Sequence, residues 1–394
     1  MVVPEPPRTP HVRAALRGDS AKVTPLELFF DLVFVLALTQ CTALMAHDPT
    51  WHGMAQGLLV LGVLWWAWVG YAWLTSVVDP EEVLVRIVMF VAMAGMLVAA
   101  LAVPKVFLDS GLIFACAYAV VRFSQIGLFV LASRGDPGLR SSVLGLGVST
   151  AIGVGILVIA SFTDGYLQGA LWALALLLDM GGPYLFGSEG WKLVPGHFAE
   201  RHGLIIIIAL GESIVSIGVG AEVAELDAGV ITASVLGLVV AAALWWAYFD
   251  VVALVAERRL SNAAPGRERN EIARDSFSYL HFPMVAGIVL IALGLKKTLG
   301  HVGDELHTVP AVALFGGAAL YLLAHVAFRW RNVHRFSTQR VAVAALCLLC
   351  VPLALHISAL ASVAILAAIL VLLIVYEMVR FAPLRAKLRR DLLT

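Results

Sequence analysis

The chain has 394 residues, of which 61% are hydrophobic and 14% charged, and its formal net charge at pH 7 is zero. Together with a mean hydropathy of +0.92, this composition excludes an ordinary water-soluble domain and a disordered chain. It predicts an all-α protein that crosses a membrane many times.

The first 25 residues are polar and include Arg8, Arg13, Arg17 and Lys22, with no apolar core before the first long apolar stretch. A cleavable signal peptide needs such a core. We therefore expect residues 1–25 to form a cytoplasmic N-terminal arm.

Twelve apolar stretches of transmembrane length follow in chain order. They lie at about 26–46, 55–77, 83–103, 110–132, 141–161, 166–186, 202–220, 228–250, 276–296, 309–328, 340–357 and 361–380. The sequence thus predicts a bundle of about twelve membrane-spanning helices. We divide it into a first six-helix half over 26–190, a second over 191–380, and a basic cytoplasmic tail over 381–394.

The distribution of basic residues supports this count. If both termini are cytoplasmic, 23 of the 27 Lys and Arg residues fall in cytoplasmic segments and only Lys105, Lys296 and Lys297 in outer loops. Cytoplasmic loops collect basic residues, so we expect a multi-pass protein of the bacterial plasma membrane, with the lipid bilayer as its partner. The same rule, together with attraction to anionic lipid headgroups, explains the basic stretches. They therefore do not indicate nucleic-acid binding. The longest cytoplasmic connection, 258–274, looks like a mobile linker.

Short segments recur between the halves. Leu64-Trp-Trp-Ala-Trp68 returns as Leu244-Trp-Trp-Ala-Tyr248, Ala94-Gly95 resembles Ala286-Gly287, and Glu27 corresponds to Glu200. These matches favour an internal repeat whose halves are related by an axis along the membrane normal, the arrangement of several transporter folds. The alternative is chance recurrence of Trp pairs in interfacial belts.

Acidic side chains inside the spans are the first candidates for function. Glu27 and Asp31 share one helical face at the start of the first span, where hydrocarbon penalises each charge by roughly 2.5 to 3.5 kcal/mol. Such groups are bound, paired or protonated. With Glu212 and Asp250 they form our candidate set for binding an ion or a proton.

A guanidinium at mid-membrane depth needs an acidic partner. Arg122 stands near the middle of the fourth span and Glu212 near the middle of the seventh, so we predict a charge pair between them. The alternative partners are backbone carbonyls or Asp179. Gly211, beside Glu212, indicates either a bend or close approach of a neighbour, or simple small-residue packing.

His197, Glu200 and Arg201 precede the seventh span and can share one face of a helix. His281 lies near the start of the ninth span. Imidazole titrates near neutrality, so these four residues are candidates for a proton relay. They could equally form a network that satisfies amides at the start of a helix.

No cofactor signature is present: the sequence has no phosphate-binding glycine loop, nucleotide fingerprint or Gly-x-Ser-x-Gly elbow. The chain is therefore more plausibly not an enzyme. His, Asp and Glu could bind a metal, but no pair has a specific ligand spacing. Cys41, Cys116, Cys347 and Cys350 all lie in apolar runs, which favours structural roles.

Several of these segments resemble the low-temperature-requirement A (LtrA) family of bacterial membrane proteins. The segment Thr24 to Gln40, with the sequence TPLELFFDLVFVLALTQ, is similar to the family's opening signature. Further matches follow in the family's order at 197–203, 210–213, 245–250 and 279–281. The resemblance implies an integral membrane protein and carries no settled activity, substrate or cofactor.

We read the chain as a twelve-helix bundle in two halves, with a polar chamber on the cytoplasmic side. The function that this reading favours is secondary transport of an unknown substrate, coupled to a proton or cation. One alternative is a membrane-embedded enzyme or metal-binding protein that uses the same acids and histidines. Another is a sensor or scaffold without turnover. The sequence does not indicate the oligomeric state.

Overall fold

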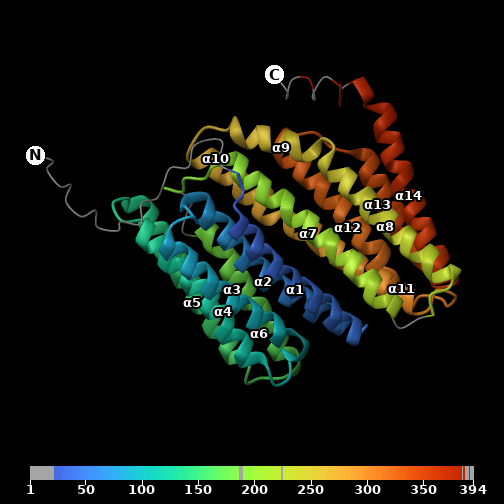
Figure 1. Cartoon of the computed structure of the whole chain (residues 1–394), viewed down its shortest axis with the longest axis horizontal. Coiled ribbons are helices and arrows are strands. Elements are labelled where there is room, and N and C mark those ends of the chain that lie inside the picture. The colour runs from blue at the N-terminus through green and yellow to red at the C-terminus, as the bar shows by residue number, and fades with distance from the viewer. Residues whose placement is uncertain (1–21, 186–189, 223–224, 384, 387–389, 391–394) are drawn as a thin grey trace, which may run out of the picture.

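The computed structural model describes residues 22–185, 190–222, 225–383, 385–386 and 390. Most of the expected arm, 1–25, and much of the expected tail, 381–394, lie outside these residues. The described chain is helical throughout (Figure 1). Its longer helices are α1 (Pro25–His47), α2 (Trp51–Val77), α3 (Val83–Ala102), α4 (Gly111–Ala132), α5 (Pro137–Ala160), α6 (Gly165–Leu185), α7 (Pro195–Glu222), α8 (Ala228–Phe249), α11 (His281–Gly300), α12 (Thr308–Val333), α13 (Thr338–Ala354) and α14 (Ala359–Arg380).

Each predicted apolar stretch coincides with one of these helices; the bounds differ by up to five residues except at α7, which begins seven residues before the predicted 202. Ten helical segments of the described chain are long and apolar enough to cross a membrane. The other two helices fall short: α6 contains Gln168, Asp179 and Pro183, and α13 has only 17 residues. A multi-pass membrane protein follows, while the count of twelve spans stays a prediction.

The helices form two neighbouring groups, with α1 and α7 in contact between them (Figure 1). α1 packs on α2 and α3, and α7 packs on α8 and α11. Likewise α3 packs on α4, and α11 packs on α12. The most buried spans are α2 and the segment that ends in α11, so they form the centre of the bundle, and the exposed apolar side chains of the outer helices suit lipid.

Glycines let two of these helix pairs approach closely. A methyl group added at Gly95 on α3 would lie 3.2 Å from the Ala117 carbonyl oxygen of α4. A methyl group at Gly287 on α11 would lie 2.6 Å from the Gly317 carbonyl oxygen of α12. Small residues at such crossings allow the backbone contact on which helix packing in lipid depends.

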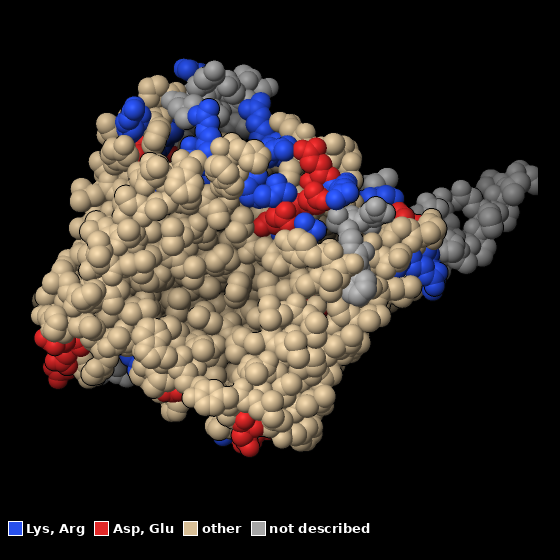
Figure 2. Space-filling view, turned by 180° about the vertical axis from the view of Figure 1, so that it is seen from behind, with Lys and Arg blue, Asp and Glu red and all other residues tan. Residues whose placement is uncertain are grey.

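Charged side chains gather at one end of the bundle, which we call the basic end. On the face in Figure 2, Lys and Arg cluster there, while the broad middle of the molecule carries almost no charge. The basic end contains the beginnings of α1 and α7 and the ends of α12 and α14. This distribution is what a membrane-spanning bundle with one basic side requires.

The expected linker at 258–274 is wrong, because this segment is largely helical. It is divided among α9 (Val252–Ser261), α10 (Arg267–Ile272) and the π-helix η2 (Ala273–Tyr279), which leads into α11. Ala256 and Leu260 bury one face of α9 against the bundle. An ion pair of 2.9 Å between Arg259 and Glu268 joins α9 to α10. The polar composition of this segment made it look like a linker. In the structure an apolar face and ion pairs attach it to the bundle.

Candidate functional site

A buried ion-pair network joins α1 to α7. The Arg201 guanidinium lies between two carboxylates: its Nη1 is 3.0 Å from Glu27 Oε1, and its Nη2 is 2.7 Å from Asp31 Oδ1. The side chains of all three residues are fully buried. Arg201 lies 174 positions from Glu27 and 170 from Asp31 in the sequence, so the network connects the two helix groups.

The start of α1 positions Glu27. Thr24 and Glu27 form a capping box, in which the Thr24 amide and hydroxyl both donate to Glu27 Oε2 at 2.8 and 2.9 Å. His197 Nε2 lies 2.9 Å from Glu27 Oε1, and its Nδ1 lies 3.2 Å from the Ser76 hydroxyl of α2. One turn of α7 thus directs both His197 and Arg201 at the same carboxylate.

The two carboxylate oxygens of Asp31 differ in their hydrogen bonds. Its Oδ1 accepts from Arg201 and, at 2.8 Å, from the indole N–H of Trp68 on α2. Its Oδ2 is buried and has no hydrogen-bond partner among the described residues. A buried carboxylate oxygen without a donor is costly, and a proton or small cation bound there would remove that cost.

Glu200 does not join this network. Its side chain is exposed, and Oε2 accepts from the Val23 backbone amide at 3.1 Å. The predicted grouping of His197, Glu200 and Arg201 therefore applies to His197 and Arg201 only. Since residues 197 and 201 are one turn apart on α7, they share its buried face, and Glu200 lies outside it.

The predicted Arg122–Glu212 pair is wrong. Arg122 on α4 pairs with Asp179 on α6 at 2.8 Å, which is one of the alternatives that the sequence left open. Tyr118 donates to Asp179 at 2.6 Å, and Thr150 on α5 donates to it at 2.8 Å. Depth estimated from the sequence favoured Glu212, but it does not show which acid a neighbouring helix presents to Arg122; in the structure that acid is Asp179, which also accepts from the Tyr118 and Thr150 hydroxyls.

Glu212 instead lies at the α1–α7 interface. Its carboxyl accepts hydrogen bonds from the hydroxyls of Thr39 on α1 and Ser216 on α7. It is fully buried, and no cationic side chain of the described chain pairs with it. Gly211 beside it has open space where a side chain would begin, so no neighbour requires a glycine there.

His281 belongs to a separate aromatic cluster at the basic end. Its Nε2 lies 2.8 Å from the Tyr248 hydroxyl, and its Nδ1 lies 3.0 Å from the Ser276 carbonyl oxygen. The buried imidazole of His202, which sequence reasoning did not select, packs on the His281 ring with centroids 5.1 Å apart. No hydrogen bond of the described chain connects His281 to His197, so the predicted relay is not continuous through direct contacts.

Asp250 also lies outside the network. It ends α8 and pairs with Arg385, which follows α14. Close by, Arg340 on α13 makes a bidentate pair with Glu377 on α14 at 2.8 and 2.9 Å. Sequence reasoning missed this pair because it depends on how α13 and α14 pack against each other. Glu377, an acid within the last apolar stretch, was the available signal.

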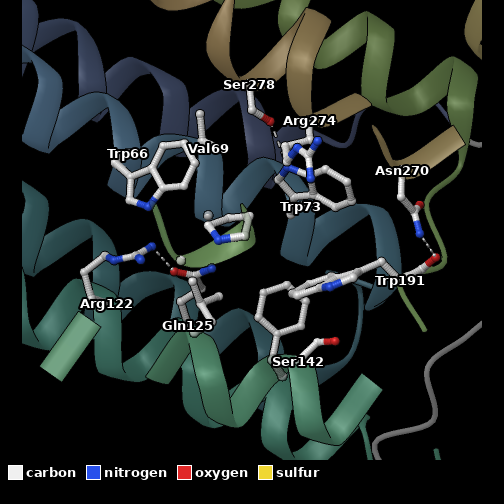
Figure 3. Close-up of a pocket in the computed structure, with 15 residues that line it drawn as sticks. Trp66, Val69, Trp73, Arg122, Gln125, Ser142, Trp191, Asn270, Arg274 and Ser278 are labelled. Carbon is white, nitrogen blue, oxygen red and sulfur yellow. Dashed lines mark hydrogen bonds between the residues drawn. The ribbon is translucent and has the colours of Figure 1, made fainter. Parts of the chain in front are cut away.

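A small cavity of about 50 Å³ lies beside Arg122, which pairs with Asp179 (Figure 3). Its lining extends from Trp191, Asn270 and Arg274 at the basic end to Trp66 and Arg122 in the middle of their helices. Indole rings form much of the wall, and the Gln125 amide accepts from Arg122 at 2.7 Å. The cavity thus offers aromatic faces and a guanidinium at mid-depth.

Within the described residues, no group of three or more His, Cys, Asp or Glu could hold a metal ion.

The comparisons with known proteins agree with the sequence signature. The profile of the family "Bacterial low temperature requirement A protein (LtrA)" matches residues 22–375. The chain belongs to the LtrA family. This LtrA protein is also 31% identical over 317 residues to an uncharacterized protein of Rhizobium meliloti (strain 1021), a match that covers 77% of the chain and 76% of that protein. No solved structure matches it significantly.

Proposed function

We propose that this LtrA protein is a secondary transporter that couples movement of a small substrate to binding of a proton or cation at Asp31. The observation that carries the proposal is the buried Asp31 Oδ2, which has no donor while Oδ1 already accepts from Arg201 and Trp68. Binding a positive charge at Oδ2 would weaken the hold of Asp31 on Arg201, which links the two helix groups.

The helix neighbours support a rocking mechanism. If residues 26–190 and 191–380 are parallel-related halves, α1 and α7 are their corresponding first helices, and each packs on its own second and third helix. Transporters of this type switch access by moving one half against the other around a site at their interface. The Arg201 network and Glu212 both lie at that interface, where loss or gain of a charge would act directly on the contact.

The cavity in Figure 3 is the proposed substrate route on the basic side. It leads from the basic end to Arg122 and is lined by Trp66, Trp73 and Trp191. At about 50 Å³ the cavity is smaller than a typical small-molecule site, so this route must widen when the substrate passes. In this proposal, Glu212 acts as a second protonatable group of the interface.

The test uses the purified protein in liposomes that contain a pH-sensitive dye. Gradients of fractionated small-molecule extracts are imposed, and the luminal pH is followed. Wild-type protein should change the pH with at least one fraction, and Asp31→Asn and Glu212→Gln should abolish that change while the protein stays folded. The matched control is Asp304→Asn, because Asp304 is an exposed acid at the opposite end of the bundle. Failure of every fraction with wild-type protein, or coupling retained in Asp31→Asn, contradicts the proposal.

A further inference from the structure

A second and larger cavity, of about 280 Å³, opens at the basic end among α8, α9, α12, α13 and α14. It far exceeds the roughly 10–15 Å³ that a cavity needs in order to hold one water molecule. Its charged lining comprises Asp250, Arg329, Arg335, Arg340, Glu377 and Arg385. Four guanidinium groups thus face two carboxylates, and the cavity carries an excess of positive charge.

Two of the four arginines are neutralised by acids. Arg340 pairs with Glu377, and Arg385 pairs with Asp250. The other two have no acid within ion-pair distance in the described chain. Among the described residues, the half-buried Arg329 donates only to the Ser337 hydroxyl, at 2.7 Å, and Arg335 is exposed.

Trp246 on α8 also contributes to the wall of the cavity. Its indole nitrogen is fully buried and does not reach the cavity surface. The two guanidinium groups without an acid partner among the described residues therefore favour a ligand with several anionic oxygens.

The remaining wall is largely apolar, apart from Asn332 and Gln339. Val251, Val252 and Val255 line one part of the cavity, and Phe328 and Phe381 line others. The nearby Val379 on α14 is 75% exposed, on a surface that suits acyl chains. An anion whose other end is apolar would satisfy both parts of the lining, as basic pockets between helices on a cytoplasmic face do for anionic headgroups.

We propose that this cavity binds a phosphate group, held by Arg329 and Arg335. The phosphate comes either from the headgroup of an anionic lipid or from free inorganic phosphate. The site is independent of the Asp31 network. It joins the end of α14 to α12 and α8, so its occupation stabilises the packing of the last helices.

The test measures the thermal stability of the purified protein in neutral detergent. Phosphatidylglycerol, phosphatidylcholine and inorganic phosphate are titrated separately. Wild-type protein should be stabilised by phosphatidylglycerol or by phosphate, and not by phosphatidylcholine. Stabilisation by phosphatidylglycerol alone identifies a headgroup site, and stabilisation by phosphate alone a free-anion site. No stabilisation by either, or equal stabilisation by phosphatidylcholine, overturns the proposal.

Variants assign the effect to the cavity. Arg335→Gln changes an exposed side chain without a buried partner, so it should fold normally and weaken the apparent affinity about tenfold, as expected for loss of one charge-assisted hydrogen bond. Arg329→Gln with Arg335→Gln should abolish the response. Arg86→Gln is the control, because Arg86 is exposed at the same end and pairs with Glu81. Equal affinity in wild type and Arg335→Gln, or the same loss in Arg86→Gln, would refute the assignment.

Discussion

Thr39 on α1 donates its hydroxyl hydrogen to Glu212 on α7, and the two residues lie 173 positions apart, the same separation as Glu27 and Glu200. Thr39→Val should therefore leave one oxygen of a buried carboxyl without its donor. We expect a loss of about 1–3 kcal/mol in the free energy of unfolding, measured by denaturing-detergent titration in mixed micelles. Thr39→Ser, which keeps the hydroxyl, is the control. Equal stability of the valine and serine variants would show that the hydrogen bond does not hold the interface.

The Arg201 guanidinium contacts both Glu27 and Asp31, so its loss should be the most damaging single change in the network. Arg201→Gln should cost about 3–5 kcal/mol of stability, because it leaves two buried carboxylates without that cation. Arg201→Lys should recover only part of this loss, since one ammonium cannot reproduce the two-sided contact.

The comparison for Arg201→Gln is Arg86→Gln, which breaks an exposed ion pair and should change the stability by no more than about 1 kcal/mol. Thermal unfolding followed by tryptophan fluorescence reports both variants. If the two substitutions have similar effects, the network contributes little to the α1–α7 contact.

Arg122 and Asp179 should be energetically coupled. A double-mutant cycle of Arg122→Gln and Asp179→Asn should give a coupling energy of about 0.5–3 kcal/mol, because the two side chains are buried and in direct contact. The corresponding cycle with Arg122→Gln and Glu212→Gln tests the pairing that depth alone suggested. It should be additive within about 0.5 kcal/mol. Larger coupling to Glu212 than to Asp179 would mean that the structure has assigned the wrong partner.

Two glycines on neighbouring helices should respond oppositely to substitution. Gly287→Ala places a methyl group 2.6 Å from the Gly317 carbonyl oxygen and 3.0 Å from the Tyr321 amide nitrogen. Since backbone atoms cannot move aside easily, we expect a loss of about 1–3 kcal/mol from overpacking. Gly211→Ala meets nothing within 4 Å and should be neutral or stabilising by up to about 1 kcal/mol. Unfolding midpoints in micelles decide between them, and a tolerated Gly287→Ala contradicts the close crossing.

The helices were predictable because each is a long apolar run bounded by polar or turn residues, and the family because its signature is local. The ion-pair partners of the buried charged residues could not be predicted. A helical sequence gives the depth of Arg122, but not the direction in which neighbouring helices present their acids. Glu27 and Asp31 were found because they share a face of α1. Their link to Arg201 was missed because it depends on how α1 packs against α7.

Two features at the ends of the spans were not predicted from the sequence. The segment 258–274 has too many charged residues for a span and was read as a linker, although α9 has one apolar face. Arg340 and Glu377 lie 37 residues apart at the facing ends of α13 and α14, so their pairing requires the hairpin between these helices to be known. Long-range contacts of this kind carry no local pattern.

Asp136 should cap α5 and stabilise it in a pH-dependent way. Its side chain accepts from the Leu139 amide at 3.1 Å and lies 3.2 Å from Lys192 Nζ. The Leu139 amide, followed by Lys192, holds the pKa of Asp136 below its usual range. A carboxyl whose pKa is lowered by folding adds stability above its ordinary pKa, and that stability is lost as the pH falls through the lowered value.

Asp136→Ala should cost about 1 kcal/mol near neutral pH through loss of the cap. Asp136→Asn should keep most of the cap and lose the acid dependence, and unfolding measured between pH 7 and pH 3 compares the three proteins. A wild-type protein whose stability relative to Asp136→Asn does not fall in acid would contradict the ionised cap.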